Sequence, residues 1–254
     1  MNGGTTCTAT GLRLVPELGE TTYRIAKPRY GALSAPERTA RSARKRWGRY
    51  DSLGRTLYLA REAESAFAEV LSPFKRQLGA LDPLESDAAA LGLTRSELLE
   101  LVAEEWGEAQ FMGMGAVPQQ WRVDRCVYEV IGQGDGWWID VEHPDSLSVL
   151  EATIEPTLIR QGVRSLTTAV LRGENRIVTT AVGMHLRGIE LFDGSVARGL
   201  QFGSKHGGGW CRAAWMPGAA DSWSADFIAT SGEPLLVTDE HLARASERFR
   251  IKVF

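Results

Sequence analysis

Residues 49–70 read RYDSLGRTLYLAREAESAFAEV and predict a strand that runs directly into a helix. Residues 56–60 carry the β-branched and aromatic side chains that are typical of a short buried strand. From residue 62 to residue 71 the apolar spacing changes to that of a helix. We therefore expect a buried strand leading into an amphipathic helix.

Two polar side chains stand at this junction, Tyr58 near the end of the strand and Glu69 in the helix. At about 100° per residue, Glu69 falls roughly 60° beyond the edge of the apolar face, so its carboxylate is expected to be partly solvated. The ring and hydroxyl of Tyr58 could point into the same cleft. The alternative is an ordinary solvated glutamate and a core aromatic, which the pattern alone favours. The apolar face consists of Ala63, Ala66, Phe67, Val70 and Leu71.

Three blocks of sequence carry a further signal. The middle block contains Arg49-Tyr50-Asp51, then LYLA at residues 57–60 and AFAEV at residues 66–70. Upstream lies Tyr23-Arg24-Ile25, and downstream lies RGLQFGSK at residues 198–205. In this order the blocks resemble the core of the RES domains, a family named for its Arg, Glu and Ser. Its members are mostly bacterial toxins of toxin–antitoxin pairs that consume NAD.

The resemblance implies a role for each residue of a site. Glu69 would stabilise the ribosyl cation that forms when the nicotinamide–ribose bond breaks. Arg24 and Arg49 would hold the phosphates or fix the nicotinamide side of the cofactor. Tyr58 would stack on nicotinamide or shape its pocket, and Ser204 would bond ribose or phosphate. NAD is thus the expected substrate.

Two positions depart from the family's commoner pattern. Phe202 and Lys205 stand where a tyrosine and an arginine are frequent, which leaves the details of substrate binding open. Arg176 matches an arginine often seen in the family, although a structural role at the start of a helix is the safer interpretation. His206 lies two residues after Ser204, but no nucleophile-elbow motif and no suitably spaced acidic residue support a Ser–His catalytic pair.

Residues 38–49 (RTARSARKRWGR) form the most basic segment. Cations around an aromatic suit nucleic acid, but one short cluster is thin support for that function. A solvated loop is the ordinary alternative. A third interpretation is that Arg49 reaches an anionic cofactor, because its planar guanidinium can bind two pyrophosphate oxygens at once. The resemblance selects Arg49, and Arg46 is the alternative alignment.

The expected activity is NAD degradation by hydrolysis or phosphorolysis of the nicotinamide–ribose bond. ADP-ribosylation of a protein target is one alternative, and the residues do not choose among water, phosphate and protein as acceptor. A second alternative is a non-catalytic module that binds proteins through residues 93–120. The resemblance also implies a cognate antitoxin, commonly a helix-turn-helix protein, and the sequence leaves homo-oligomerisation open.

Composition limits the other classes of function. The chain has 254 residues, 43% of them hydrophobic and 24% charged, which suits one substantial core. A net charge of −3 gives no general attraction to nucleic acid or to anionic membranes. Cys7, Cys126 and Cys211 form no CxxC pair or zinc-like spacing, so no metal is expected. No export signal or transmembrane segment is evident, and a cytoplasmic location follows as the expectation.

We predict an α+β fold: a mixed, mainly antiparallel β-core with flanking helices, similar to ADP-ribosyltransferases. Residues 1–20 are expected to be a loose leader, and residues 21–254 a single RES-like domain with a helical insertion at about 75–120. Thr94 and Glu97 predict a capping box within that insertion. A hairpin is expected to turn at residues 132–136. Other predicted strands cover residues 21–26, 199–204, 210–216 and 250–254, and predicted helices cover residues 144–161 and 174–186.

Overall fold

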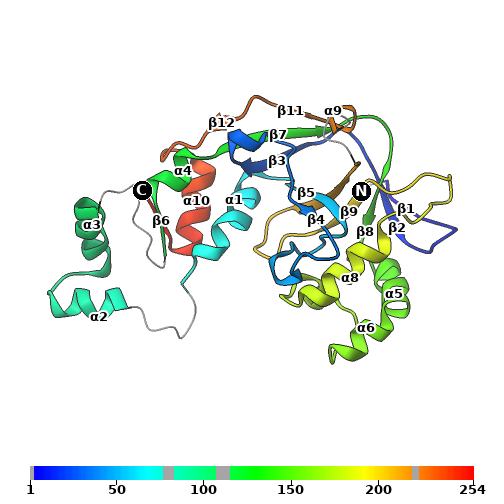
Figure 1. Ribbon diagram of the computed structural model, residues 1–254, viewed down its shortest axis with the longest axis horizontal. Coiled ribbons are helices and arrows are strands. Elements are labelled where there is room, and N and C mark those ends of the chain that lie inside the picture. The colour runs from blue at the N-terminus through cyan, green and yellow to red at the C-terminus, as the bar shows by residue number, and fades with distance from the viewer. Residues whose placement is uncertain (1–2, 77–82, 107–114, 219–222) are drawn as a thin grey trace.

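A computed structural model describes residues 3–76, 83–106, 115–218 and 223–254. Its fold is α+β and its main sheet is mostly antiparallel, as predicted (Figure 1). The sheet has the order β1-β2-β8-β9-β10-β5-β3-β7-β11, with β4 also on β5 and β12 also on β7. Only β8 and β9 pair in parallel among these described strands. The strands are β1 (Thr5–Thr6), β2 (Arg13–Pro16), β3 (Thr21–Ala26), β4 (Glu37–Arg38), β5 (Gly54–Ala60), β7 (Cys126–Gly132), β8 (Trp137–Asp140), β9 (Gly199–Gly203), β10 (Trp210–Met216), β11 (Phe227–Ala229) and β12 (Glu233–Pro234).

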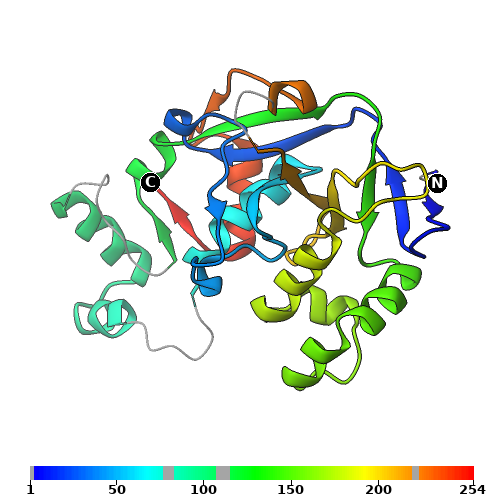
Figure 2. The same cartoon turned by 45° about the vertical axis from the view of Figure 1, so that its right-hand side comes forward.

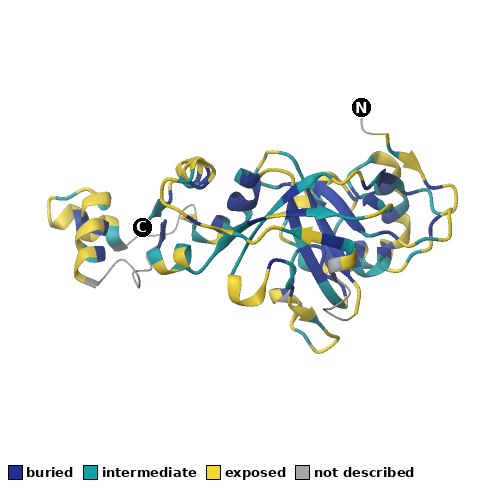
Figure 3. Cartoon of the chain, turned by 90° about the horizontal axis from the view of Figure 1, so that it is seen from above, coloured by how far each residue is buried: buried dark blue, intermediate teal, exposed yellow. Residues whose placement is uncertain are grey.

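The middle of the sheet is the most buried part of the protein (Figure 3). Strand β10 lies between β9 and β5, and Ala213 is in register with Leu200 on one side and Tyr58 on the other. Because Ala213 is small, it leaves room for its larger neighbours to pack. The predicted strands 21–26, 199–204 and 210–216 correspond to β3, β9 and β10.

Helix α1 (Ala63–Leu71) follows β5 directly, as the apolar spacing of residues 62–71 predicts. It packs beside α10 (Glu240–Phe249), and the two helices adjoin in both views (Figures 1 and 2). The interface buries Phe67 and Leu71 of α1 against Leu242 and Phe249 of α10. Burying each such side chain stabilises the fold by about 1.5–3 kcal/mol. Helix α1 is therefore held firmly on a second helix.

A group of helices shares a buried core with β8, β9 and β10: α5 (Pro144–Thr153), α6 (Glu155–Arg160), α7 (Thr168–Arg172) and α8 (Arg176–Leu186). The expected single helix over residues 144–161 is two helices that meet at Ile154. Pro156 explains the break, because proline lacks the N–H that a continuous helix requires. Asn175 caps α8 by accepting hydrogen bonds from the backbone N–H of Ile177 and Val178.

The segment expected to be a helical insertion contains α2 (Pro83–Ala90) and α3 (Arg95–Trp106), which stand at one edge of the molecule (Figure 1). Residues 77–82 and 107–114 of this segment lie outside the described residues. The capping box is confirmed, since Thr94 N donates to Glu97 and Glu97 N donates to Thr94 Oγ1. Lys252 of β13 (Lys252–Val253) reaches Glu100 of α3 at 2.5 Å. Strand β13 pairs in parallel with β6 (Ala116–Val117).

Short helices complete the described elements. Three 3-10 helices cover Pro28–Tyr30, Arg44–Arg46 and Ser72–Phe74. Two short α-helices are α4 (Gln119–Val123) and α9 (Trp223–Asp226). None of the described helices combines the length and hydrophobicity that crossing a lipid bilayer requires.

The expectation of a loose leader over residues 1–20 is wrong for the described part of it. Strand β2 pairs with β8, and the side chains of Leu12 and Leu14 are buried in the main core. Glu17 is buried too, and it accepts a hydrogen bond from Trp138 Nε1. The polar composition of the first residues concealed this strand, since only alternate positions face the core.

The expected hairpin around residues 132–136 is also wrong. Strand β7 pairs with β3, β11 and β12, whereas β8 pairs with β2 and β9. The two strands are consecutive in sequence but are not neighbours in the sheet. The glycine-rich segment between them is thus a connection across the fold.

Candidate active site

The junction of β5 and α1 opens onto a cavity of about 470 Å³. That volume lies within the usual range of small-molecule sites. Four of the predicted site residues line the cavity: Arg24 from β3, Arg49 before β5, Tyr58 from β5 and Glu69 from α1. Ser204, the fifth, follows β9 and reaches the cavity through Glu69.

Glu69 is held by groups from two distant parts of the chain. Its Oε1 accepts a hydrogen bond from Ser204 Oγ at 3.0 Å and lies 3.6 Å from Arg49 Nη2. Its Oε2 lies 4.0 Å from His206 Nε2. The side chain of Glu69 is 31% exposed. Its carboxylate is therefore oriented by these neighbours and still faces the cavity. This matches the partial solvation expected from the helical position of Glu69.

Arg49 is buried, with only 6% of its side chain exposed. Its guanidinium lies over the ring of Phe202 at 5.1 Å, and its Nη1 has no hydrogen-bond partner in the part of the chain that the structure describes. A buried donor without a partner is costly, and a bound anion would satisfy it. Phe202, one of the departures from the family pattern, thus supports the guanidinium through its ring face.

Arg24 is a second cation on the wall with an unsatisfied donor. Its Nη2 donates to Ser34 O at 2.6 Å, while no described residue partners its Nε. Burial lowers the pKa of Arg24 to about 10, since no carboxylate in the described residues pairs with it. A guanidinium in this setting gains more from an anionic ligand than one that is already paired.

Tyr58 contributes its ring to the cavity, but its hydroxyl is already engaged. The hydroxyl donates to Asp51 Oδ1 at 2.8 Å and accepts from Tyr50 N at 3.0 Å. Burial raises the pKa of Tyr58 well above its ordinary value, and the adjacent Asp51 raises it further. The phenol therefore stays protonated and fixes the segment that carries Arg49.

Asp51 is the centre of that fixed segment. Its Oδ2 accepts from Arg38 Nε at 2.6 Å and from Gly48 N at 2.8 Å. A Cβ at Gly48 would lie 2.5 Å from the Tyr58 hydroxyl, so only glycine fits between the ring and the loop. Residues 48–51 are thereby locked against β5, which places Arg49 beside Glu69.

Ser204 lies behind Glu69 rather than on the cavity wall. Its Oγ donates to Glu69 and accepts from His206 N at 3.2 Å. The imidazole of His206 contacts the ring of Phe249. Burial lowers the pKa of His206, although the nearby Glu69 carboxylate opposes this shift.

The structure brings further residues to the cavity that the sequence did not single out as site residues: Arg38, Asp51 and Lys205. Arg176, whose role was left open, also lines it, and its Nη1 has no hydrogen-bond partner among the residues described. Glu174 binds both Arg176 and Lys205 from outside the lining. Arg46 is exposed and absent from the described lining, so of Arg46 and Arg49 only Arg49 lines the cavity.

The described lining thus contains five cationic side chains and two carboxylates. This balance contrasts with the net charge of −3 for the whole chain and favours an anionic ligand. Within the described ranges, no three His, Cys, Asp or Glu side chains are grouped to hold a metal ion. The cations are Arg24, Arg38, Arg49, Arg176 and Lys205, and the carboxylates are Asp51 and Glu69.

Comparison of the chain with protein-family models, curated proteins and solved structures finds no match.

Proposed function

We propose that the cavity binds NAD and that the chain cleaves the bond between nicotinamide and ribose. When this bond breaks, nicotinamide leaves with the bonding electron pair, and positive charge develops on the anomeric carbon of the ribose. A fixed carboxylate beside that carbon stabilises the charge. The observation that carries the proposal is Glu69, a partly exposed carboxylate oriented by Ser204 and flanked by Arg49.

The second carboxylate of the cavity is a poorer candidate. Asp51 is buried and accepts hydrogen bonds from Tyr58, Arg38 and Gly48. Its oxygens are committed to holding the loop, whereas Glu69 Oε2 accepts no hydrogen bond from a described residue. Glu69 is thus the carboxylate that can face a ribose hydroxyl or the developing cation.

The pyrophosphate of NAD requires cations that match its oxygens. Arg24 Nε, Arg49 Nη1 and Arg176 Nη1 are buried donors that find no partner among the described residues. Each guanidinium can give a charge-assisted hydrogen bond to phosphate, which is about twice as strong as a neutral one. The ring of Tyr58 forms part of the wall and would shape the nicotinamide pocket, while its hydroxyl holds the loop.

The acceptor of ADP-ribose is water or phosphate in this proposal. With water, the products are nicotinamide, ADP-ribose and a proton. With inorganic phosphate, the phosphate oxygen forms the new bond to the anomeric carbon and the product is an ADP-ribosyl phosphate. Transfer to a protein target would pass through the same ribosyl cation, and Glu69 would stabilise it in the same way.

The test is to incubate the purified chain with NAD and to measure free nicotinamide by chromatography. Glu69→Gln preserves the shape of the side chain and should lower turnover at least about a hundredfold. Glu62→Gln changes an exposed glutamate just before α1 and should retain turnover. Undiminished turnover in a folded Glu69→Gln variant would remove the assignment. Parallel reactions with phosphate, and with labelled NAD and cell protein, identify the acceptor.

On the resemblance, we propose further that NAD loss makes the chain a toxin that a partner antitoxin restrains. Expression of the intact chain alone should lower cellular NAD and arrest growth, whereas expression of Glu69→Gln should do neither. The reading frame next to the gene is the place to seek the partner. Co-expression of that neighbour should restore growth and NAD content.

A further inference from the structure

A second cavity of about 640 Å³ adjoins the first. Both cavities are lined by Arg24 and Ile25 of β3, by Pro36 and by Val70 of α1. Shared walls make the two spaces neighbours, with Arg24 at their boundary. A ligand longer than a mononucleotide could therefore extend from one cavity into the other.

The second cavity is cationic. Its described lining contains Arg24, Lys27, Arg55 and Arg125 but no aspartate or glutamate. Lys27 pairs with Asp124 at 3.1 Å, outside the lining. Arg24 and Arg125 pair with no carboxylate in the described structure, and burial lowers the pKa of both. These two guanidinium groups favour a ligand that brings negative charge.

Flat surfaces for stacking accompany the charge. Tyr30 ends a 3-10 helix on the wall, and 61% of it is exposed. The guanidinium of Arg29 lies 4.7 Å from its ring centroid. The guanidinium of Arg125 lies 4.2 Å from the ring centroid of Trp121, and its Nη1 donates to Trp121 O. Aromatic rings and arginine planes held in this way are the surfaces on which nucleic-acid bases stack.

We propose that the second cavity binds the adenylate half of a dinucleotide whose nicotinamide half occupies the first cavity. Arg24 contacts the phosphates at the boundary, and both Tyr30 and Arg125 supply stacking surfaces for the base. The placement of the nicotinamide half rests on the proposed function, whereas binding of an adenylate depends only on the second cavity. The substrate class is then a dinucleotide rather than a nicotinamide mononucleotide.

The kinetic test compares NAD with nicotinamide mononucleotide, which lacks the adenylate. Tyr30→Ala and Arg125→Ala should each raise KM for NAD by about tenfold, the loss expected for one stacking contact. KM for the mononucleotide should stay within about twofold, because that molecule does not reach the second cavity. An equal rise for both substrates, or no rise for NAD, would overturn the inference.

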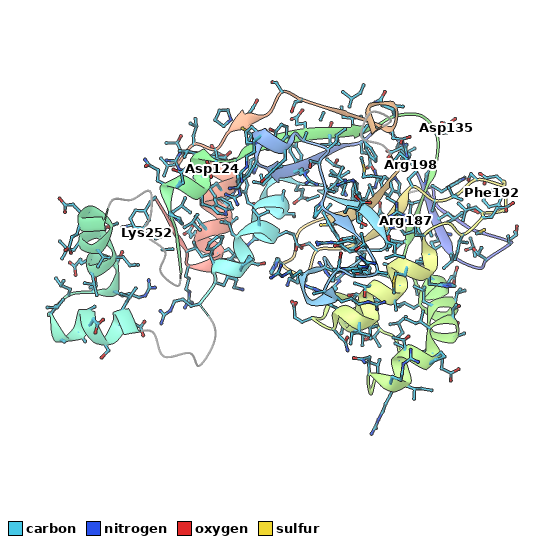
Figure 4. All side chains as sticks on the ribbon, in the orientation of Figure 1. Asp124, Asp135, Arg187, Phe192, Arg198 and Lys252 are labelled. Carbon is cyan, nitrogen blue, oxygen red and sulfur yellow. The ribbon has the colours of Figure 1, made fainter. Side chains whose placement is uncertain are left out.

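Matched controls separate this effect from general damage. Phe192→Ala removes another exposed aromatic that lines neither cavity, and Figure 4 shows Phe192 far from Asp124, the partner of Lys27. Arg164→Ala removes an exposed arginine that lines neither cavity. Both controls should bind and turn over NAD as the unaltered chain does.

A binding measurement that needs no catalysis keeps the two proposals distinguishable. AMP is titrated calorimetrically into the unaltered chain, Tyr30→Ala and Phe192→Ala. Binding that weakens about tenfold in Tyr30→Ala alone supports the second cavity, even if no variant releases nicotinamide and the proposed function fails. Absence of AMP binding at millimolar concentration, or equal binding by all three proteins, overturns the inference, even if NAD is cleaved.

Discussion

Ser204 donates a hydrogen bond of 3.0 Å to Glu69, although 135 residues separate them in the sequence. The bond joins the residue after β9 to the last turns of α1, and it sets the carboxylate beside Arg49. Ser204 is absent from the described lining of the cavity and donates to Glu69, which favours a positioning role, while its contact with ribose or phosphate stays a prediction. The serine and the glutamate act as one unit in this geometry.

The first prediction concerns Ser204→Ala. Removing the hydroxyl frees Glu69 to rotate, so kcat for NAD should fall about tenfold or more while KM changes little. The free energy of unfolding should fall by only about 1–2 kcal/mol, the value of one partly buried hydrogen bond. Steady-state kinetics and urea unfolding measure both quantities.

The matched control for this prediction is Ser195→Ala. Its hydroxyl also donates to a carboxylate, that of Asp193, but in an exposed turn. Its kcat and KM should equal those of the unaltered chain. A Ser204→Ala variant with normal kcat would show that Glu69 needs no orientation by the serine.

The second prediction separates the ring of Tyr58 from its hydroxyl. Tyr58→Phe leaves Asp51 Oδ1 and Tyr50 N without their partner, and both lie in the buried loop. The free energy of unfolding should therefore fall by about 1–3 kcal/mol. In the fraction that stays folded, KM for NAD should change because Arg49 moves with the loop, although the hydroxyl takes no part in the proposed chemistry.

Tyr30→Phe is the reference for this measurement, since its side chain is exposed and its stability should change by less than about 0.5 kcal/mol. Urea unfolding measures the free energy of unfolding of both variants. If Tyr58→Phe were as stable as the unaltered chain but inactive, the hydroxyl would act in the chemistry instead.

Local sequence pattern predicted the elements that carry the site but not the cavity that they enclose. The change of period near Glu62 is visible in a short window, and β5 and α1 follow from it. The strand before Ser204, β9, could likewise be predicted from a short window of sequence. Glu69 and Ser204 were paired only by resemblance, because periodicity contains no information on contacts 135 residues apart.

The missed features depend on strand pairing, which is non-local. Strands β7 and β8 form a plausible hairpin in sequence, yet each finds other partners in the sheet. Asp51 could have been suspected, since it lies beside Arg49 in the same block. Its role as acceptor for Arg38 and Tyr58 becomes visible only when β4 and β5 are paired.

The third prediction concerns pH. Burial lowers the pKa of His206, so the folded chain holds the neutral imidazole at pH values where the unfolded chain, with an ordinary pKa of about 6.5, takes up a proton. Stability from this group is therefore fully present above about pH 6.5 and is lost as the pH falls below it. Glu69 opposes the shift, while Lys205, Lys75 and Arg49 reinforce it.

His206→Gln should accordingly lose less free energy of unfolding between about pH 7.5 and 5.5 than the unaltered chain does. Urea unfolding at several pH values measures the difference. His185, whose pKa is also lowered by burial, contributes in the same direction, so His185→Gln should reduce the slope independently. If the free energy of unfolding of His206→Gln changed with pH as it does in the unaltered chain, the imidazole of His206 would have the same pKa in the folded and unfolded states.

The last prediction reverses the usual effect of a substitution in a helix. Gly183 lies in α8, where alanine normally stabilises by about 1 kcal/mol over glycine. A Cβ at this position would lie 2.5 Å from Tyr50 O and 3.3 Å from Asp51 O, both backbone atoms of the loop that carries Arg49. Those atoms cannot rotate away as a side chain could, so either α8 or the loop must move.

Gly183→Ala should thus destabilise the fold by about 1–3 kcal/mol and should lower NAD turnover through the displacement of Arg49. Ala181→Gly, in the same helix, measures the ordinary difference in helix propensity between the two residues. It should lower the free energy of unfolding by about 1 kcal/mol and have little effect on turnover. Urea unfolding and nicotinamide release are measured on both variants. A Gly183→Ala variant that is more stable than the unaltered chain would contradict the close packing of α8 on the loop, and with it the explanation of how Arg49 is held beside Glu69.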